Sequence, residues 1–147
     1  MEIPTCLSIV VNQSQVLMIE KKRGIGKGYL TFPGGKVEEE SPEECAIREL
    51  EEEVGVKGYD PKFAGRILFR QLNGRVMSMY IYLFTKFQAE PRETEEAKPI
   101  WWRVEELPFD RMWHDDRFWL RKVLSGKVVD CVFLFTDDWG DMVEGYC

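Results

Sequence analysis

Short apolar runs separated by turn-forming residues occupy most of the chain, and this pattern predicts a protein rich in β-strands. Asn12-Gln13-Ser14 separates two such runs and predicts a hairpin. Asn73-Gly74 predicts a second hairpin, because this dipeptide favours the tight turn between antiparallel strands. A basic, glycine-rich loop is expected at 21–28 and a turn at 137–140. The predicted strands cover 7–11, 16–19, 63–69, 76–84, 100–104 and 128–135.

Two segments carry helical signals. Ser41, Pro42 and Glu44 form a capping box with proline at the first helical position, and Gly55 stands where a left-handed cap would end the helix. These signals predict a helix over 42–54. Apolar residues at helical spacing predict a second helix over 117–124. A mixed sheet with two helices is an α+β fold or a layered α/β/α fold. The 147 residues suit a single domain over 1–147.

Composition excludes several classes of protein. Hydrophobic residues make up 44% and charged residues 31%, which is typical of a folded globular chain. The 26 acidic residues outnumber the 20 basic ones, so a broad nucleic-acid-binding surface is not expected. No apolar run approaches the roughly 20 residues of a membrane-spanning helix. The N-terminus lacks the basic start of a secretory signal, so we expect a cytoplasmic protein with no membrane partner.

The four cysteines are Cys6, Cys45, Cys131 and Cys147, and none of them forms a Cys-x-x-Cys pair. With a single histidine, His114, a Cys/His zinc site is not expected. In a cytoplasmic protein, scattered cysteines are typical of reduced thiols. We therefore expect four free thiols.

The first predicted helix carries an unusual acidic face. Glu49, Glu52 and Glu53 are spaced i, i+3 and i+4, so they project on one side of the helix and repel one another. Arg48 is the only basic residue between Ser41 and Val56. One interpretation is a solvated acidic face. The other is a site for Mg²⁺, which binds carboxylate oxygens together with water and phosphate oxygens.

The residues before the helix favour the second interpretation. The pattern Gly34-x5-Glu40-x7-Arg48-Glu49-Leu50-x-Glu52-Glu53-x-Gly55-Val56 resembles the signature of the Nudix hydrolases at its nine fixed positions. The signature is counted from Gly34 and not from Gly35, because the loop lacks the glycine that many members carry before Glu40. A deletion of one residue in this loop explains the count.

The resemblance implies the Nudix fold, in which a mixed sheet lies between helices. It also implies hydrolysis of a nucleoside diphosphate linked to another group, with Mg²⁺ or Mn²⁺ as cofactor. Glu49, Glu52 and Glu53 would bind the metal together with Gly34 and the loop residue Glu96. Glu52 or Glu53 would also take a proton from the attacking water. In the same scheme Arg48 would orient Glu49, and Glu40 would brace the loop.

Further segments resemble one branch of the family, the MutT-type oxidized-purine nucleoside triphosphatases, or 8-oxo-dGTP diphosphatases. They are the glycine-rich stretch that begins with Lys21-Lys22-Arg23, the segment Trp113-x-Asp115-Asp116, and the pattern of the C-terminal strand. The resemblance implies that Trp113 stacks on the purine and that the two aspartates read its edge. Adjacent carboxyl groups suit this role, because they can share a proton and so present both a donor and an acceptor. The alternative is that Asp115 or Asp116 only caps the second helix.

The branch also implies a wider set of substrate-binding residues. Lys21 matches a lysine that contacts the substrate, and the alternative is an ordinary surface lysine. Phe69 and Met77 would line the base pocket, and the alternative is that they belong to the core beneath the strands. The chain departs from the animal 8-oxo-dGTP diphosphatase of this branch in places: Cys6 replaces a threonine, Thr31 replaces an asparagine, and Ile25 and Gln71 replace aromatic residues. Besides Trp113 and the aspartates, the expected substrate-binding residues are Cys6, Lys21, Thr31, Pro33, Gly34, Gly35, Lys36, Phe69 and Met77.

The expected activity is Mg²⁺-dependent hydrolysis of oxidized purine dNTPs, such as 8-oxo-dGTP, to the monophosphate and pyrophosphate. The same chemistry on ADP-ribose, a dinucleoside polyphosphate or another nucleoside diphosphate derivative is the alternative. A nucleotide-sensing module without catalysis is disfavoured by the intact carboxylates and by the lack of an appended DNA-binding segment. The expected partner is a small nucleotide, and the protein is expected to be a monomer or a homodimer.

Overall fold

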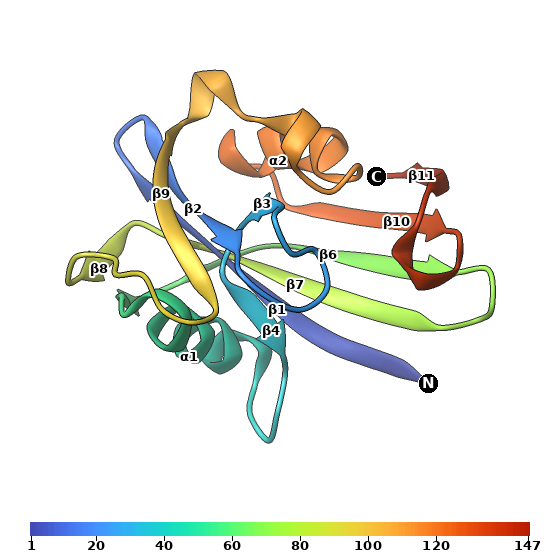
Figure 1. Cartoon of the computed structure of the whole chain (residues 1–147), viewed down its shortest axis with the longest axis horizontal. Helices are drawn as coiled ribbons and strands as arrows, with labels where there is room; N and C mark the ends of the chain where they lie inside the picture. The colour runs from blue at the N-terminus through green and yellow to red at the C-terminus, as the bar shows by residue number, and fades with distance from the viewer.

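The computed structural model describes all 147 residues, and it places a mixed sheet between two helices (Figure 1). The helices are α1 (Pro42–Val54) and α2 (Asp116–Leu124). The strands are β1 (Glu2–Asn12), β2 (Gln15–Lys21), β3 (Leu30–Thr31), β4 (Gly34–Lys36), β5 (Lys57–Tyr59), β6 (Lys62–Gln71), β7 (Val76–Phe84), β8 (Lys86–Gln88), β9 (Ala97–Arg103), β10 (Val129–Phe135) and β11 (Met142–Tyr146). Short 3₁₀ turns lie at η1 (Val104–Glu106), η2 (Phe109–Arg111) and η3 (Asp137–Trp139).

The main sheet runs in the order β11-β10-β6-β7-β1-β2-β3, with β4 paired to β1 and β9 paired to β2. β1 is parallel to β7 and β6 is parallel to β10, whereas the other pairs in the sheet are antiparallel. β5 and β8 form a separate two-stranded sheet. The predicted α+β class, both predicted helices and all six predicted strands are confirmed, with boundaries shifted by a few residues.

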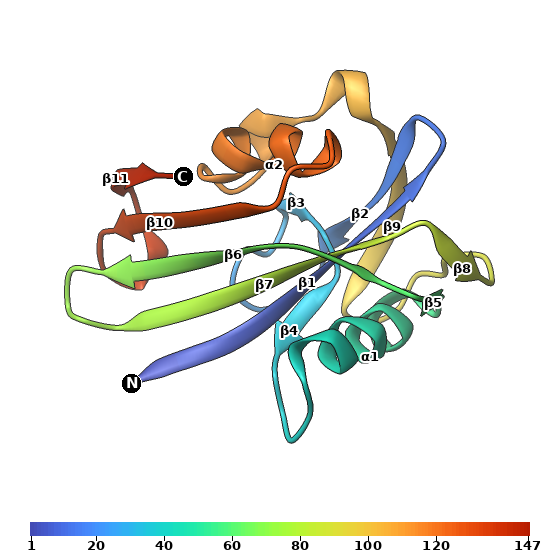
Figure 2. The same ribbon diagram turned by 180° about the vertical axis from the view of Figure 1, so that it is seen from behind.

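Alternating side chains of the central strands feed two separate cores. On β1, Leu7 and Ile9 belong to the cluster beneath α2, whereas Cys6 and Val10 belong to the cluster beneath α1. This period-two alternation is what a strand buried on both faces requires. Figures 1 and 2 show the consequence, with α1 and α2 covering opposite sides of the strands.

The expectation of four free thiols is wrong. Cys6 on β1 is joined to Cys45 on α1, and Cys131 on β10 is joined to Cys147 just beyond β11. The sequence spacing could not reveal these pairs, because the partners are 39 and 16 residues apart and only the packing of α1 on β1 and the pairing of β11 with β10 bring them together. Neither helix is long and apolar enough to cross a membrane.

Candidate active site

Helix α1 is fixed at both ends by the residues that predicted it. The Ser41 side chain accepts from the backbone N–H of Glu44, and the Glu44 side chain accepts from the backbone N–H of Ser41. At the other end Gly55 is left-handed, with φ 75°, and its N–H donates to Glu51 O. Two capped ends set the register of the helix, and with it the direction of the acidic face.

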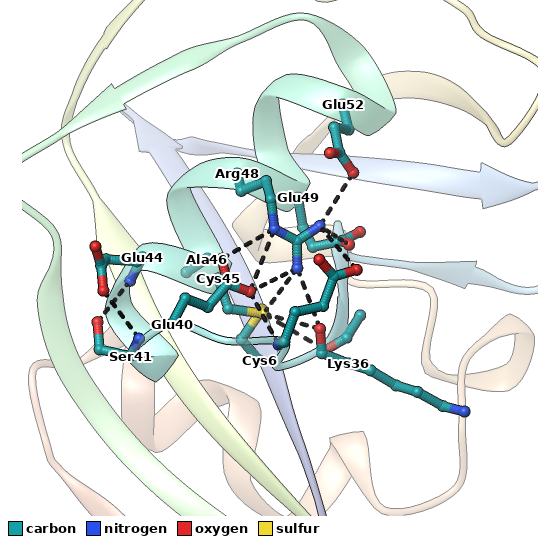
Figure 3. A network of polar contacts seen from close by, with 12 residues as sticks. Cys6, Lys36, Glu40, Ser41, Glu44, Cys45, Ala46, Arg48, Glu49 and Glu52 are labelled. Atoms are coloured by element: carbon teal, nitrogen blue, oxygen red, sulfur yellow. Dashed lines mark hydrogen bonds and ion pairs between the residues drawn. A yellow bond between two sulfur atoms is a disulfide. The ribbon is translucent and has the colours of Figure 1, made fainter.

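Arg48 is the centre of a polar network beside this helix (Figure 3). Its guanidinium donates to Glu40 Oε2 at 2.7 Å, to Glu49 Oε1 at 2.8 Å and to Glu52 Oε2 at 3.1 Å. It also donates to the carbonyl of Lys36 at 3.2 Å. The carboxylates raise the pKa of Arg48, and the Arg48 guanidinium lowers the pKa of Glu40. One cation therefore holds three carboxylates and ties the loop after β4 to α1.

Glu53 occupies a different environment from Glu52. The backbone N–H of Gly34 donates to Glu53 Oε2 at 2.7 Å, and the side chain is partly buried. Burial, with the nearby carboxylate of Glu49 as a smaller cause, raises the pKa of Glu53 to about 8. Burial also raises the pKa of Glu49, against the opposing effect of Arg48. Two carboxyl groups thus lie together with too little positive charge to keep both ionised.

The two glycines before α1 lie in close contact with β1 and with the acidic face of the helix. A side chain on Gly34 would collide with the carbonyl of Cys6 on β1. A Cβ on Gly35 would lie 2.7 Å from the carboxyl carbon of Glu49. The Gly34 contact is with backbone, so β4 can lie this close to β1 only with glycine at that position. At Gly35 the neighbour is the end of a flexible side chain, so a Cβ there would displace the Glu49 carboxylate from its present position.

The predicted metal ligands are only partly brought together. Glu49 and Glu53 lie side by side, but Glu52 is exposed and turned to Arg48, and Glu96 is ion-paired with Arg23. No group of three or more potential ligand side chains is close enough to hold a metal ion in this arrangement. The donor chemistry nevertheless fits a hard divalent cation, because oxygen ligands with uncompensated charge converge near Gly34.

A cavity of about 320 Å³ opens next to Glu53, within the size range of small-molecule sites. It contains most of the predicted substrate-binding residues, while Pro33 is absent from its lining and instead accepts a backbone hydrogen bond from Ser8. The predicted residues that line it are Cys6, Lys21, Thr31, Gly34, Gly35, Lys36, Phe69, Met77, Trp113, Asp115 and Asp116. Residues that the sequence did not single out for substrate binding also line it: Thr5, Leu7, Ile19, Ile25, Phe32, Met79, Phe135 and Trp139.

Asp115 and Asp116 are buried in this cavity, with 3% and 5% of their surface exposed. Asp115 occupies the N-cap position of α2 but makes no capping hydrogen bond with its side chain, so the simple capping interpretation is wrong for it. Its Oδ2 instead accepts from Trp119 Nε1 at 2.9 Å. The two carboxyl groups are neighbours in the chain and both are buried, and burial raises the pKa of both. The pair therefore holds a proton far more readily than two exposed aspartates would.

Trp113 packs against the glycine-rich loop that follows β2. The Tyr29 ring packs edge-on against it, with ring centroids 4.8 Å apart. Gly26 has φ 84°, and a Cβ there would lie 2.9 Å from Cζ2 of Trp113. Glycine at this position is therefore needed both for the backbone conformation and for the approach to the indole.

Residues 3–123 match the family described as the NUDIX domain. The chain belongs to the Nudix family. The match covers the acidic helix and the strands β1 to β9, so the resemblance extends well beyond the signature.

Similar proteins of the Nudix family include two vertebrate enzymes. The oxidized purine nucleoside triphosphate hydrolase of Danio rerio is 36% identical over 82% of this chain and 79% of its own length. The protein of the same name from Mus musculus is 35% identical over 89% of this chain and 85% of its own length. Among solved structures, a MutT protein from Bacillus halodurans superimposes with a TM-score of 0.85 at 26% identity, covering 98% of this chain and 96% of that one.

Sequence reasoning missed the cavity wall contributed by the C-terminal part of this Nudix chain. Phe135 lies at the end of β10 and Trp139 in η3, and both fall outside the signature and outside residues 3–123. The apolar run at 128–135 indicated a buried strand, but nothing in the run indicated that its end borders a cavity.

Proposed function

We propose that this Nudix protein is a hydrolase that converts oxidized purine deoxynucleoside triphosphates, such as 8-oxo-dGTP, to the monophosphate and pyrophosphate. The observation that carries the proposal is one cavity that contains both chemistries. Glu53 and Gly34 line it at the end of the acidic helix, and Trp113, Asp115 and Asp116 line it at the start of α2. The names of the Danio rerio and Mus musculus relatives support the same substrate class.

The buried aspartate pair suits an altered purine. A pair that shares one proton offers a hydrogen-bond donor and an acceptor at neutral pH. Oxidation of a purine changes the pattern of donors and acceptors on its edge, so such a pair can distinguish the altered base from the normal one. Trp113 offers a broad aromatic face to the base, an interaction typically worth about 1–3 kcal/mol.

The phosphates would lie toward α1 and the basic residues of the cavity. Lys21 and Lys36 line the cavity and supply positive charge for the triphosphate. In the reaction a water oxygen bonds to phosphorus, the anhydride bond between the α- and β-phosphoryl groups breaks, and pyrophosphate leaves. Glu52 or Glu53 would accept the proton of the water, while Arg48 keeps Glu49 in place through the 2.8 Å hydrogen bond.

Glu49, Glu52 and Glu53 would hold the divalent cation, Mg²⁺ or Mn²⁺, with Gly34 and Glu96 as further ligands. When bound, this cation would polarise the phosphate oxygens and make the attacking water more acidic. The chain's own part is to place oxygen donors with unbalanced negative charge beside the cavity. Glu52 is free to reach inward because it is exposed and its only ionic contact is with Arg48.

Product analysis tests the reaction class. The wild-type protein is incubated at fixed Mg²⁺ with 8-oxo-dGTP, 2-hydroxy-dATP, the normal dNTPs, ADP-ribose and a diadenosine polyphosphate, and the products are separated. We expect pyrophosphate and the oxidized monophosphate as the main products. Preferential release of AMP and ribose phosphate from ADP-ribose, or cleavage of the dinucleotide alone, would contradict the proposed substrate class. It would not contradict the proposed role of the carboxylates in phosphate hydrolysis.

A further inference from the structure

The turn after β10 brings a tryptophan into the cavity from outside the family signature. Trp139 lies in η3 and lines the same cavity as Trp113, Asp115 and Asp116. Its ring packs edge-on against Phe69, with centroids 6.3 Å apart, and against Phe135 at 6.1 Å. The ring is half-buried, so it stands between the cavity and the solvent at this end of the sheet.

The backbone of this turn adopts a conformation that bulky residues rarely accept. Asp138 has φ 60° and ψ 30°, and Trp139 has φ 56°. Two consecutive left-handed residues without a glycine are uncommon and persist only where the surroundings hold them. Here the hairpin between β6 and β7 does so, because the backbone N–H of Asn73 donates to Asp137 Oδ1 at 2.8 Å.

Gln71 on β6 makes the second contact that holds the turn. Its Oε1 accepts from the backbone N–H of Asp138 at 3.2 Å. Only 3% of its surface is exposed, and its Nε2 has no hydrogen-bond partner. Burying an amide with an unpaired donor is unfavourable. The hydrogen bond to Asp138 gives this position a reason for a polar side chain, and it acts on the residue next to Trp139.

We propose that Trp139 is a specificity-determining residue that favours a two-ring purine over a one-ring pyrimidine, and that Gln71 is the positioning residue that holds it. This inference rests on the proposed function. The aromatic groups of the cavity give a flat bicyclic base a large contact area, and Trp139 closes the cavity on the side of Phe69 and Phe135. A pyrimidine is smaller, so it gains less from the same wall. Because Trp139 is an apolar wall, it does not distinguish an oxidized purine from a normal one.

The test compares three nucleotides on folded variants. Steady-state kcat and KM are measured with 8-oxo-dGTP, dGTP and dCTP for the wild type, Trp139→Ala and Trp139→Phe. For Trp139→Ala we expect KM to rise about tenfold for both purine nucleotides, in line with the loss of one aromatic contact. The kcat for the purines should stay within about twofold of the wild-type value, and the KM for dCTP should change by less than about twofold. The ratio of kcat/KM between 8-oxo-dGTP and dGTP should stay constant. The KM of Trp139→Phe for the purines should lie between those of the wild type and Trp139→Ala.

Trp101→Ala is the matched control, because Trp101 is also half-buried but packs against Phe87 in the other core. It should lower thermal stability without changing the ratio between purine and pyrimidine. Calorimetric binding of dGMP provides a readout that does not depend on turnover. We expect the Kd to weaken about tenfold in Trp139→Ala and not in Trp101→Ala.

The role of Gln71 is tested by coupling. Gln71→Met keeps a side chain of similar length but removes the acceptor for Asp138, so KM for the purines should rise while dCTP is unaffected. If Gln71 acts through Trp139, the double variant Gln71→Met/Trp139→Ala should be no worse than Trp139→Ala alone. Additive losses would contradict a positioning role.

The wild-type and variant measurements separate the two proposals. A wild type that fails on every purine triphosphate overturns the proposed function, and the inference with it. A wild type that prefers purines while folded Trp139→Ala or Trp139→Phe keeps the wild-type KM overturns the inference alone. Equal losses on 8-oxo-dGTP, dGTP and dCTP would also overturn it, because they would mean a general loss of structure and not a loss of base selection.

Discussion

The backbone N–H of Gly34 donates to Glu53 Oε2 at 2.7 Å, joining β4 to the last turn of α1. The two residues lie near opposite ends of the signature, and both line the cavity. The contact explains why the two glycines of β4 and the acidic residues of α1 occur together in the signature. The strand must come close enough for its amide to reach the carboxylate, and a side chain on Gly34 would collide with the carbonyl of Cys6 and prevent that approach.

The first prediction concerns the stability of the protein without metal. Glu53 has a pKa of about 8 when folded, above the 4.5 of an ordinary glutamate. The folded state therefore holds the proton more tightly than the unfolded state, and the free energy of unfolding falls as the pH rises from about 4.5 to about 8. Glu53→Gln keeps an acceptor for Gly34 and removes this cost. In EDTA it should be more stable than the wild type at pH 8, by roughly 2–4 kcal/mol.

Thermal unfolding at pH 5 and pH 8, with and without Mg²⁺, checks this expectation. The stability gain of Glu53→Gln should be small at pH 5 and large at pH 8, and Mg²⁺ should stabilise the wild type more than the variant. An equal difference at both pH values would contradict the assignment of the raised pKa to Glu53.

Glu52→Gln should impair catalysis without unfolding the protein. The Glu52 side chain is 60% exposed and loses only its ion pair with Arg48, so we expect a stability change below about 1 kcal/mol. If Glu52 binds the catalytic cation, kcat should fall roughly 100-fold or more. Glu51→Gln is the control on the same helix, because Glu51 is 50% exposed and lies 3.9 Å from Lys57. Near-normal turnover of Glu52→Gln would exclude Glu52 from the metal site.

Trp113→Ala should chiefly weaken binding of the base. The indole lines the cavity and packs against Tyr29, and its loss removes an aromatic contact worth about 1–3 kcal/mol. KM for 8-oxo-dGTP should rise about tenfold or more, with a smaller change in kcat. Steady-state kinetics at several substrate concentrations measure both constants. Unchanged KM and kcat would mean that the base binds elsewhere.

The disulfides predict a dependence on reducing agents. Chain-entropy arguments give a stabilisation of about 3–4 kcal/mol for each bond, given the separations of 39 and 16 residues. Cys45→Ser should lower the free energy of unfolding by a similar amount under oxidising conditions and by much less in the presence of dithiothreitol. Thiol titration of the unfolded, unreduced protein should find no free thiol. Four reactive thiols in that titration would show that the bonds do not form.

The acidic helix was predictable because its signals are local. Ser41 and Gly55 mark its ends through hydrogen bonds to residues within one turn, and the spacing of the glutamates sets their direction. The long strands were predictable from apolar runs for the same reason. β3 and β4 were not, because two- and three-residue strands have no period of their own and exist only through pairing with β2 and β1.

The contacts between distant segments escaped prediction. The raised pKa of Glu53 depends on burial beneath β4, and the pairing of Cys6 with Cys45 depends on the packing of α1 against β1. Trp139 reaches the cavity through a left-handed turn that no residue type in Asp137-Asp138-Trp139 favours strongly enough to predict. Each of these features follows from the arrangement of elements in space, which the local pattern does not specify.

The most direct test of the central claim is the ratio of kcat/KM for 8-oxo-dGTP to that for dGTP, measured for the wild-type protein at fixed Mg²⁺ and neutral pH. We expect a clear preference for 8-oxo-dGTP, at least about tenfold, with stoichiometric pyrophosphate, and a loss of that preference in Asp116→Asn. Equal kcat/KM for the two nucleotides, or no pyrophosphate from either, would contradict it.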